Sequence, residues 1–179
     1  MTRTLKAFLW LAVAVAVPSA ALAQSGQGDI SVSGNLGFAN AFDEDFDGLE
    51  AFFNGTFEFH TSDEIAWRGM LGRAKFDGRV DDVGGEVKVI LVNANIVRYW
   101  EGDVTPFLTG GVGLYNRDHD GPFFLDDDGD LEFGINGGGG VDFPLEDGWA
   151  IKVEGLFHGI TGDEPDVFFT ATGGVKYTF

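Results

Sequence analysis

The sequence predicts an all-β protein: an eight-stranded, antiparallel, up-and-down transmembrane β-barrel. Three observations predict this fold. Apolar residues recur at every second position in eight segments, long and short connections alternate between these segments, and the apolar side chains are too bulky for the bore of so small a barrel.

Composition narrows the classes of protein that the chain can belong to. Of its 179 residues, 29 are acidic and 11 are basic, which gives a formal net charge of -18. We expect no nucleic-acid partner, because phosphate binding depends on a surplus of lysine and arginine. The absence of cysteine excludes disulfides and thiolate metal sites. With 44% apolar residues, the chain can form a large buried or lipid-facing surface.

Residues 1–23 are predicted to be a cleaved secretory signal peptide, which leaves residues 24–179 as one barrel domain. The segment has a positive start at Arg3 and Lys6, then an uncharged apolar run, then small residues at the cleavage site. The alternative is a membrane anchor, which needs about 20 apolar residues and different flanking residues.

Each expected strand is identified by apolar residues at every second position. In the first four strands, at residues 29–38, 50–60, 65–74 and 87–100, they are Ile30, Val32, Leu36 and Phe38; Ala51, Phe53, Phe57 and Phe59; Ile65, Trp67 and Leu71; and Ile90, Val92, Ala94 and Ile96. In the last four, at residues 105–115, 132–143, 149–158 and 167–179, they are Leu108, Val112 and Leu114; Phe133, Ile135, Val141 and Phe143; Trp149, Ile151, Val153 and Phe157; and Phe169, Val175, Tyr177 and Phe179.

The volume of the bore decides which face of these strands points outward. A soluble barrel of the lipocalin type shows the same alternation along any one strand, but its apolar face points inside. However, an eight-stranded barrel has an interior only just wide enough for its side chains, and small polar residues fit it better than Phe, Trp and Tyr. Glycines on the polar face, such as Gly111 and Gly138, also permit tight coiling. The bulky face is therefore expected to contact lipid.

The connections predict the orientation in the membrane. Between the expected strands they contain 11, 4, 12, 4, 16, 5 and 8 residues, so long and short alternate. This alternation is typical of an outer-membrane barrel, whose long loops lie outside and whose short turns face the periplasm.

Tryptophans support this orientation. Trp67, Trp100 and Trp149 all fall at the short-turn end, where an aromatic girdle at the membrane interface is expected. Further aromatic residues are expected at the same level, namely Phe107, Phe143, Tyr177 and Phe179. The alternative is that aromatic residues at the strand ends plug the core.

The C-terminal residues carry the most specific short motif. Thr172, Gly174, Tyr177 and Phe179 stand in the order polar, x, Gly, x, x, aromatic, x, Phe. This motif resembles the C-terminal signal by which the barrel-assembly machinery recognises outer-membrane barrels. The segment TPFLTGGVG at residues 105–113 is similar to the fifth strand of small OmpA- and OmpX-like barrels. The resemblance implies a bacterial outer-membrane location and the assembly machinery as a partner, and it implies no particular activity.

Charged residues on the polar face are expected to pair inside the bore, because an isolated buried ion is very costly. The expected network is Glu58, Arg68, Glu132, Lys152, Glu154 and Lys176, with His60 and His158 near opposite ends. Such a network predicts a plugged bore. The alternative is a bore that conducts.

The long connections hold 17 of the 29 acidic residues, and one of them resembles half of a calcium site. Asp43, Asp45 and Asp47, followed by Gly48, match the opening of an EF-hand loop, although the twelfth position is Asn54 instead of a bidentate glutamate. Calcium in the outer loops is therefore one hypothesis, and solvated acidic loops are the other. No other cofactor is expected.

The sequence predicts no catalytic site. Small barrels that modify lipid A use a histidine and a serine near the outer leaflet. Here the comparable pair is His60 with Ser62, which falls at the short-turn end. We therefore expect a monomeric, non-catalytic barrel, in contact with outer-membrane lipid and lipopolysaccharide, that serves envelope integrity or surface recognition and adhesion. A small porin-like channel and a lipid A-modifying enzyme are the alternatives.

Overall fold

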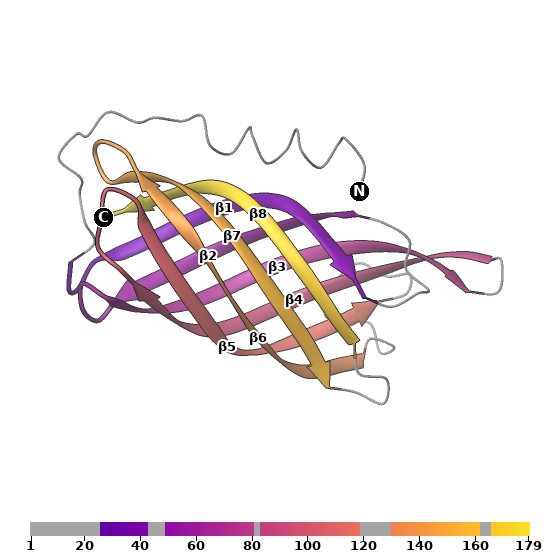
Figure 1. Cartoon of the computed structure of the whole chain (residues 1–179). Coiled ribbons are helices and arrows are strands. Elements are labelled where there is room, and N and C mark those ends of the chain that lie inside the picture. The colour runs from indigo at the N-terminus through magenta and orange to yellow at the C-terminus, as the bar shows by residue number, and fades with distance from the viewer. Residues whose placement is uncertain (1–25, 43–48, 81–82, 119–129, 162–165) are drawn as a thin grey trace.

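The chain forms a closed barrel of eight antiparallel strands, in which each strand pairs with its neighbours in sequence and β1 closes against β8 (Figure 1). The computed structural model describes residues 26–42, 49–80, 83–118, 130–161 and 166–179. The strands are β1 (Ile30–Ala41), β2 (Glu50–His60), β3 (Ile65–Val80), β4 (Val83–Tyr99), β5 (Thr105–Asp118), β6 (Asp130–Pro144), β7 (Trp149–Thr161) and β8 (Asp166–Thr178). The predicted fold class is confirmed.

No helix in the described ranges is long and apolar enough to cross a membrane.

The two faces of the strands point as predicted. Along β1 the outward Leu36 is 66% exposed, whereas the inward Ser31 is completely buried. On β2 the outward Phe53 is likewise exposed and the inward Glu58 is buried. Because strand side chains alternate with a period of two, this agreement fixes the register of the whole strand relative to the bore.

The strands extend further at the loop end than the apolar pattern predicts. The expected 12-residue connection after residue 74 is instead mostly strand, because β3 continues to Val80 and β4 begins at Val83. The register runs without a break from Lys75 opposite Lys88 to Val80 opposite Val83. Backbone pairing does not require apolar side chains, so the end of the apolar alternation did not mark the end of the strands.

This extension projects beyond the barrel as a two-stranded ribbon, which we define as residues 75–80 and 83–87 (Figure 1). The register of β2 with β3 reaches only Ala74, and that of β4 with β5 reaches only Lys88. Both outer edges of the ribbon therefore extend past the neighbouring strands.

The bore is less polar than predicted. Its loop half is filled by an apolar cluster, which we call the upper cluster: Ala39, Phe52, Met70, Ala74, Val89, Leu91, Tyr115, Leu156, Ile160 and Phe168. Large rings fit because glycines face them. A Cβ atom on Gly72 would lie 2.9 Å from the Phe52 ring, and one on Gly134 would lie 2.6 Å from the Tyr115 ring. Beside such glycines the bore has more room for a ring than the strand number alone predicts.

Candidate functional site

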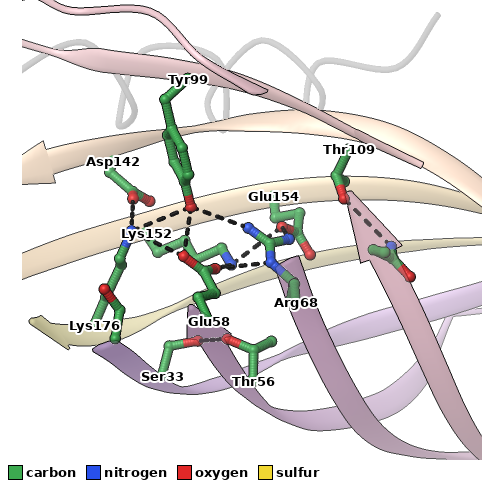
Figure 2. Close-up of polar contacts among 12 residues, drawn as sticks. Ser33, Thr56, Glu58, Arg68, Tyr99, Thr109, Asp142, Lys152, Glu154 and Lys176 are labelled. Carbon is green, nitrogen blue, oxygen red and sulfur yellow. Dashed lines mark hydrogen bonds and ion pairs between the residues drawn. The ribbon is translucent and has the colours of Figure 1, made fainter. Parts of the chain in front are cut away.

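The turn half of the bore holds a cluster of charged side chains from five strands, which we call the charge cluster. Its members are Glu58 on β2, Arg68 on β3, Asp142 on β6, Lys152 and Glu154 on β7, and Lys176 on β8. All six are buried. Their side chains converge, as Figure 2 shows, because each occupies an inward position close to the short-turn end of its strand.

Glu58 is at the centre of the charge cluster. Its Oε1 accepts a hydrogen bond from Arg68 Nε at 2.8 Å, and its Oε2 forms an ion pair with Lys176 Nζ at 3.2 Å. Lys152 Nζ lies 3.6 Å from the same carboxylate. One acidic side chain is therefore in contact with three basic ones (Figure 2).

Two further carboxylates complete the charge balance. Glu154 accepts a hydrogen bond from Arg68 and forms an ion pair with Lys152 Nζ at 3.2 Å. Asp142 accepts a hydrogen bond from Lys176 Nζ at 2.9 Å. Three carboxylates thus face three cations, so the cluster carries no formal net charge. This balance offsets much of the cost of removing six charges from water.

Two aromatic side chains cover the charge cluster. The Tyr99 hydroxyl donates to Glu58 Oε2 at 2.6 Å and accepts from Lys176 at 3.2 Å. The Phe107 ring lies 5.0 Å from the Arg68 guanidinium and 5.2 Å from Lys152 Nζ. The expectation that Phe107 belongs to the interface girdle is wrong. It is 2% exposed and lies in the bore, because it shares the strand face of Thr109 and Gly111.

The structure also places the remaining predicted network residue and reveals one that was missed. Glu132 lies opposite Tyr115 in the loop half of β6, away from the charge cluster. Asp142, ten positions along the same strand, takes part in the cluster instead. Strand parity identifies Asp142 as inward, since it shares the face of Gly138 and Gly140, and the same rule identifies Tyr99 on the face of Asn93 and Asn95.

A layer of uncharged polar side chains lies in the bore beside the charge cluster. Asn35 Nδ2 donates to Asn54 Oδ1 at 2.6 Å, and Asn95 Nδ2 donates to Asn136 Oδ1 at 2.5 Å. Ser33 and Thr56 share a hydrogen bond of 2.6 Å (Figure 2). Polar side-chain hydrogen bonds thus link β1 to its neighbour β2, and β4 to β6, which is not its neighbour.

Neither histidine in the bore forms an accessible catalytic pair. His60 Nε2 lies 3.1 Å from Ser31 Oγ, so its serine neighbour is Ser31 and not Ser62. Ser62 Oγ instead accepts from the backbone N–H of Ile65 in the exposed turn. Ser31 is 0% exposed, and its hydroxyl also shares a 2.8 Å hydrogen bond with Thr178. A substrate cannot reach the Ser31 hydroxyl in this position.

His158 is enclosed in the loop half of the bore. Its Nδ1 lies 3.0 Å from the Tyr115 hydroxyl and its Nε2 lies 3.2 Å from Thr170 Oγ1. The ring stacks on Phe168 at a centroid distance of 4.4 Å and is 0% exposed. Because all of these contacts are internal, this histidine links strands and faces no solvent.

At the turn end, the bore opens into a cavity of about 270 Å³. His60, Tyr99, Asp142 and Lys176 form its inner wall, and Asp63 and Glu101 lie at its rim among other residues. The cavity ends at the charge cluster, so it is a vestibule at the turn end of the barrel. Within the described residues, no three histidine or acidic side chains are grouped as metal ligands.

The other predicted site residues lie elsewhere. Asp43, Asp45 and Asp47 are outside the described residues, as is the predicted signal peptide, so calcium binding and cleavage stay predictions. The side chains of Trp67, Trp100 and Trp149 are exposed at the short-turn end.

The four residues of the C-terminal motif have different surroundings. Thr172 faces the bore, and Tyr177 packs between Trp149 and Phe179 at centroid distances of 4.7 and 4.8 Å. A Cβ atom on Gly174 would collide with the Gly34 carbonyl oxygen, so the closing contact of β8 with β1 requires glycine there. Recognition of this motif by the assembly machinery stays a prediction.

The charge cluster predicts that replacing Arg68 destabilises the barrel more than replacing the exposed Arg98. Arg68→Ala leaves Glu58 and Glu154 with fewer cations in the bore, and we expect it to lower the free energy of unfolding by about 3–5 kcal/mol. The matched control is Arg98→Ala, whose exposed partner Glu64 lies 3.6 Å away, with an expected change of at most about 1 kcal/mol. Urea titration of the folded barrel, followed by tryptophan fluorescence, measures both. Equal losses in the two variants would contradict the role given to Arg68.

Comparison with known proteins agrees with this geometry. The family model of the outer membrane protein beta-barrel domain matches residues 9–179. A search of curated proteins finds no match. Among solved structures, the chain is similar to Neisserial surface protein A, with a TM-score of 0.70 and 13% identity over 86% of this chain and 100% of that one.

Two other solved structures show the same fold. The attachment invasion locus protein Ail of Yersinia pestis has a TM-score of 0.58 and 17% identity over 86% of this chain and 99% of that one. The outer membrane enzyme PagL has a TM-score of 0.51 and 15% identity over 82% and 98%. At these identities the likeness shows the fold alone, whereas the family model covers almost the whole chain. The protein belongs to the outer membrane protein beta-barrel domain family and is located in the bacterial outer membrane.

Proposed function

We propose that this chain is a non-catalytic barrel with a closed bore, which serves envelope integrity or surface recognition through its loop end. The observation that carries the proposal is the filling of the bore. Arg68, Glu58 and Lys152 are each at most 2% exposed, and the apolar upper cluster lies above them. A solute that crosses the barrel has to displace both layers.

The charge cluster makes ion conduction unfavourable. Every cation in it is already within 4 Å of a carboxylate, so a passing ion finds no free counter-charge. Beyond it, the side chains of Phe52, Leu91 and Phe168 offer an ion no polar surface. Desolvation without compensation costs several kcal/mol per ion. These contacts favour a structural bore over the porin-like alternative.

Two features favour recognition at the loop end. The ribbon of residues 75–80 and 83–87 extends past β2 and β5, and strand edges of this kind bind partner strands through backbone hydrogen bonds. The protein Ail, whose name refers to attachment and invasion, is built on the same fold. Recognition through loops on a rigid scaffold is the usual use of such an architecture.

Among the described residues, no accessible serine lies within hydrogen-bonding distance of either histidine of the bore. PagL shows that the fold can carry an enzyme, yet the serine nearest to His60 here is buried at the turn end, away from the outer leaflet. In the described loop half, the histidine is His158, which is enclosed by Tyr115, Thr170 and Phe168. We therefore infer a role without catalysis.

The closed bore is tested by conductance. The purified, folded monomer, inserted into a planar lipid bilayer at neutral pH, should give no steady conductance steps, because both layers of the bore exclude ions. A heat-denatured sample controls for detergent artefacts. Reproducible unitary steps that scale with the amount of folded protein would favour the porin-like alternative instead.

Recognition is tested by shortening the ribbon. Replacing residues 76–87 by a two-residue turn should reduce adhesion of expressing bacteria to a panel of immobilised matrix proteins and glycans at least tenfold. The matched variant Ser31→Ala changes only the bore and should adhere like the parent chain. Adhesion that the shortened chain retains in full would contradict the proposal, as would altered lipid A in the mass spectrum of cells that express the parent.

A further inference from the structure

The cavity at the turn end of the barrel lies outside the function proposed above, which concerns the filled bore and the loop end. Its volume of about 270 Å³ is enough for a small molecule and too little for a larger ligand. The side chains of its inner wall come from β2, β4, β6 and β8, so it is a pocket of the closed barrel and not a gap between two strands.

The ammonium group of Lys176, in this inner wall, is fully engaged by the protein. Its Nζ donates to Asp142 Oδ2 at 2.9 Å and to the Tyr99 hydroxyl at 3.2 Å (Figure 2). It also lies 3.2 Å from Glu58 Oε2. An ammonium group has three N–H donors, and these three oxygens account for all of them. An anionic ligand in the cavity therefore finds no unused donor on Lys176.

Two buried side chains of the same wall keep an unused hydrogen-bonding atom. Asp142 is 4% exposed and His60 is 1% exposed. Lys176 occupies Oδ2 of Asp142, whereas Oδ1 has no hydrogen-bond partner within the described part of the chain. Nδ1 of His60 is likewise without a partner there. Because buried polar atoms are almost always hydrogen-bonded, two such atoms in one cavity wall point to a ligand.

Both unused atoms are acceptors. Asp142 is paired with Lys176 as a carboxylate, so its Oδ1 can only accept. Nε2 of His60 lies 3.1 Å from Ser31 Oγ and 3.7 Å from Glu58 Oε2. The nearby carboxylate favours the tautomer that carries the hydrogen on Nε2, which leaves a lone pair on Nδ1. The matching ligand is therefore a hydrogen-bond donor.

The charge around the cavity favours a cation. Its lining carries three carboxylates, namely those of Asp63, Glu101 and Asp142, and the ammonium group of Lys176. Three negative charges against one positive charge leave an excess of two negative charges, which attracts cations. A metal ion is a poor match, since protein sites for metals supply three or more ligands. No such group of histidine and acidic side chains occurs in the described ranges.

We propose that this cavity binds a small organic cation that carries a primary ammonium group. One N–H donates to Asp142 Oδ1 and a second donates to His60 Nδ1, which satisfies both buried acceptors. The carboxylates of Asp63 and Glu101 attract the cation at the rim. Its alkyl group lies along Trp149, which contributes apolar surface to the cavity wall.

The test is titration of the folded, ¹⁵N-labelled protein in lipid nanodiscs with butylammonium, followed by the indole N–H signals of its tryptophans. Butylammonium should shift the signal of Trp149, which lines the cavity, and leave that of the lipid-facing Trp67 unchanged. Tetramethylammonium has the same charge and the same number of non-hydrogen atoms but no N–H donor. It should bind about tenfold more weakly, because it leaves both acceptors unpaired. Butyrate, an anion of similar size, should cause no shift of Trp149.

Variants of the wall and the rim locate the binding site. Asp142→Asn removes the acceptor charge and His60→Phe removes Nδ1, and each should weaken butylammonium binding about tenfold. Glu101→Gln at the rim should weaken it about threefold, because this carboxylate is exposed. The matched control is Glu64→Gln, an exposed carboxylate at the same end that pairs with Arg98 and lies outside the cavity, and it should bind like the parent.

Four outcomes would overturn the proposal. The first is the absence of any shift of Trp149 during the butylammonium titration of the parent chain. The second is equal binding of butylammonium and tetramethylammonium, which shows that charge alone attracts the ligand; this comparison needs no variant. The third is unchanged binding by His60→Phe, with folding verified by its mobility shift on heating. The fourth is an equal loss of binding in Glu64→Gln and Glu101→Gln.

Discussion

The narrowness of a closed eight-stranded barrel determines most of what is observed here. Strand number sets the diameter, and a bore of this width leaves little room for water around a charged side chain. Each inward charge must therefore find a protein partner. Glu58 illustrates the consequence, because it contacts Arg68, Lys152 and Lys176 at once. The charge cluster is neutral because a buried charge without a partner would cost several kcal/mol.

Closure of the barrel also determines the outer face, where the side chains are apolar. Side chains alternate across each strand, so a bore that holds Glu58 and Arg68 has Phe57 and Trp67 on its outer face. The charged residues of this chain, whose net charge is -18, are thus distributed unevenly over the barrel. The bore is neutral at the turn end, the belt is apolar, and many of the acidic residues fall in the long connections of the sequence.

Much of this arrangement could be predicted from the sequence, because period-two alternation reports directly on the two faces of a strand. Inward positions such as Lys152 and Glu154 follow from parity alone. The length of the β3–β4 ribbon could not be predicted in this way, since backbone pairing continues where apolar side chains stop. The level of Phe107 along the barrel predicts the interface girdle, but its parity on β5 places its side chain in the bore.

Contacts across the bore could not be predicted from the sequence. They depend on the stagger of strands that are not neighbours in the sheet, so the contact of Arg68 with Glu154 and that of Lys176 with Asp142 have no local signal. The upper cluster was missed for a related reason, because Phe52 occupies space that a glycine on the neighbouring strand, Gly72, leaves open.

The central claim is that the apolar face meets lipid and the other face lines a closed bore. Intermolecular nuclear Overhauser effects between lipid acyl chains and leucine methyl groups, measured on the folded protein in lipid nanodiscs, test it most directly. The account predicts strong effects at Leu71 and Leu108, which are 57% and 59% exposed, and none at Leu91 and Leu156, which are at most 1% exposed. Lipid contacts at Leu91 and Leu156, with none at Leu71 and Leu108, would contradict it.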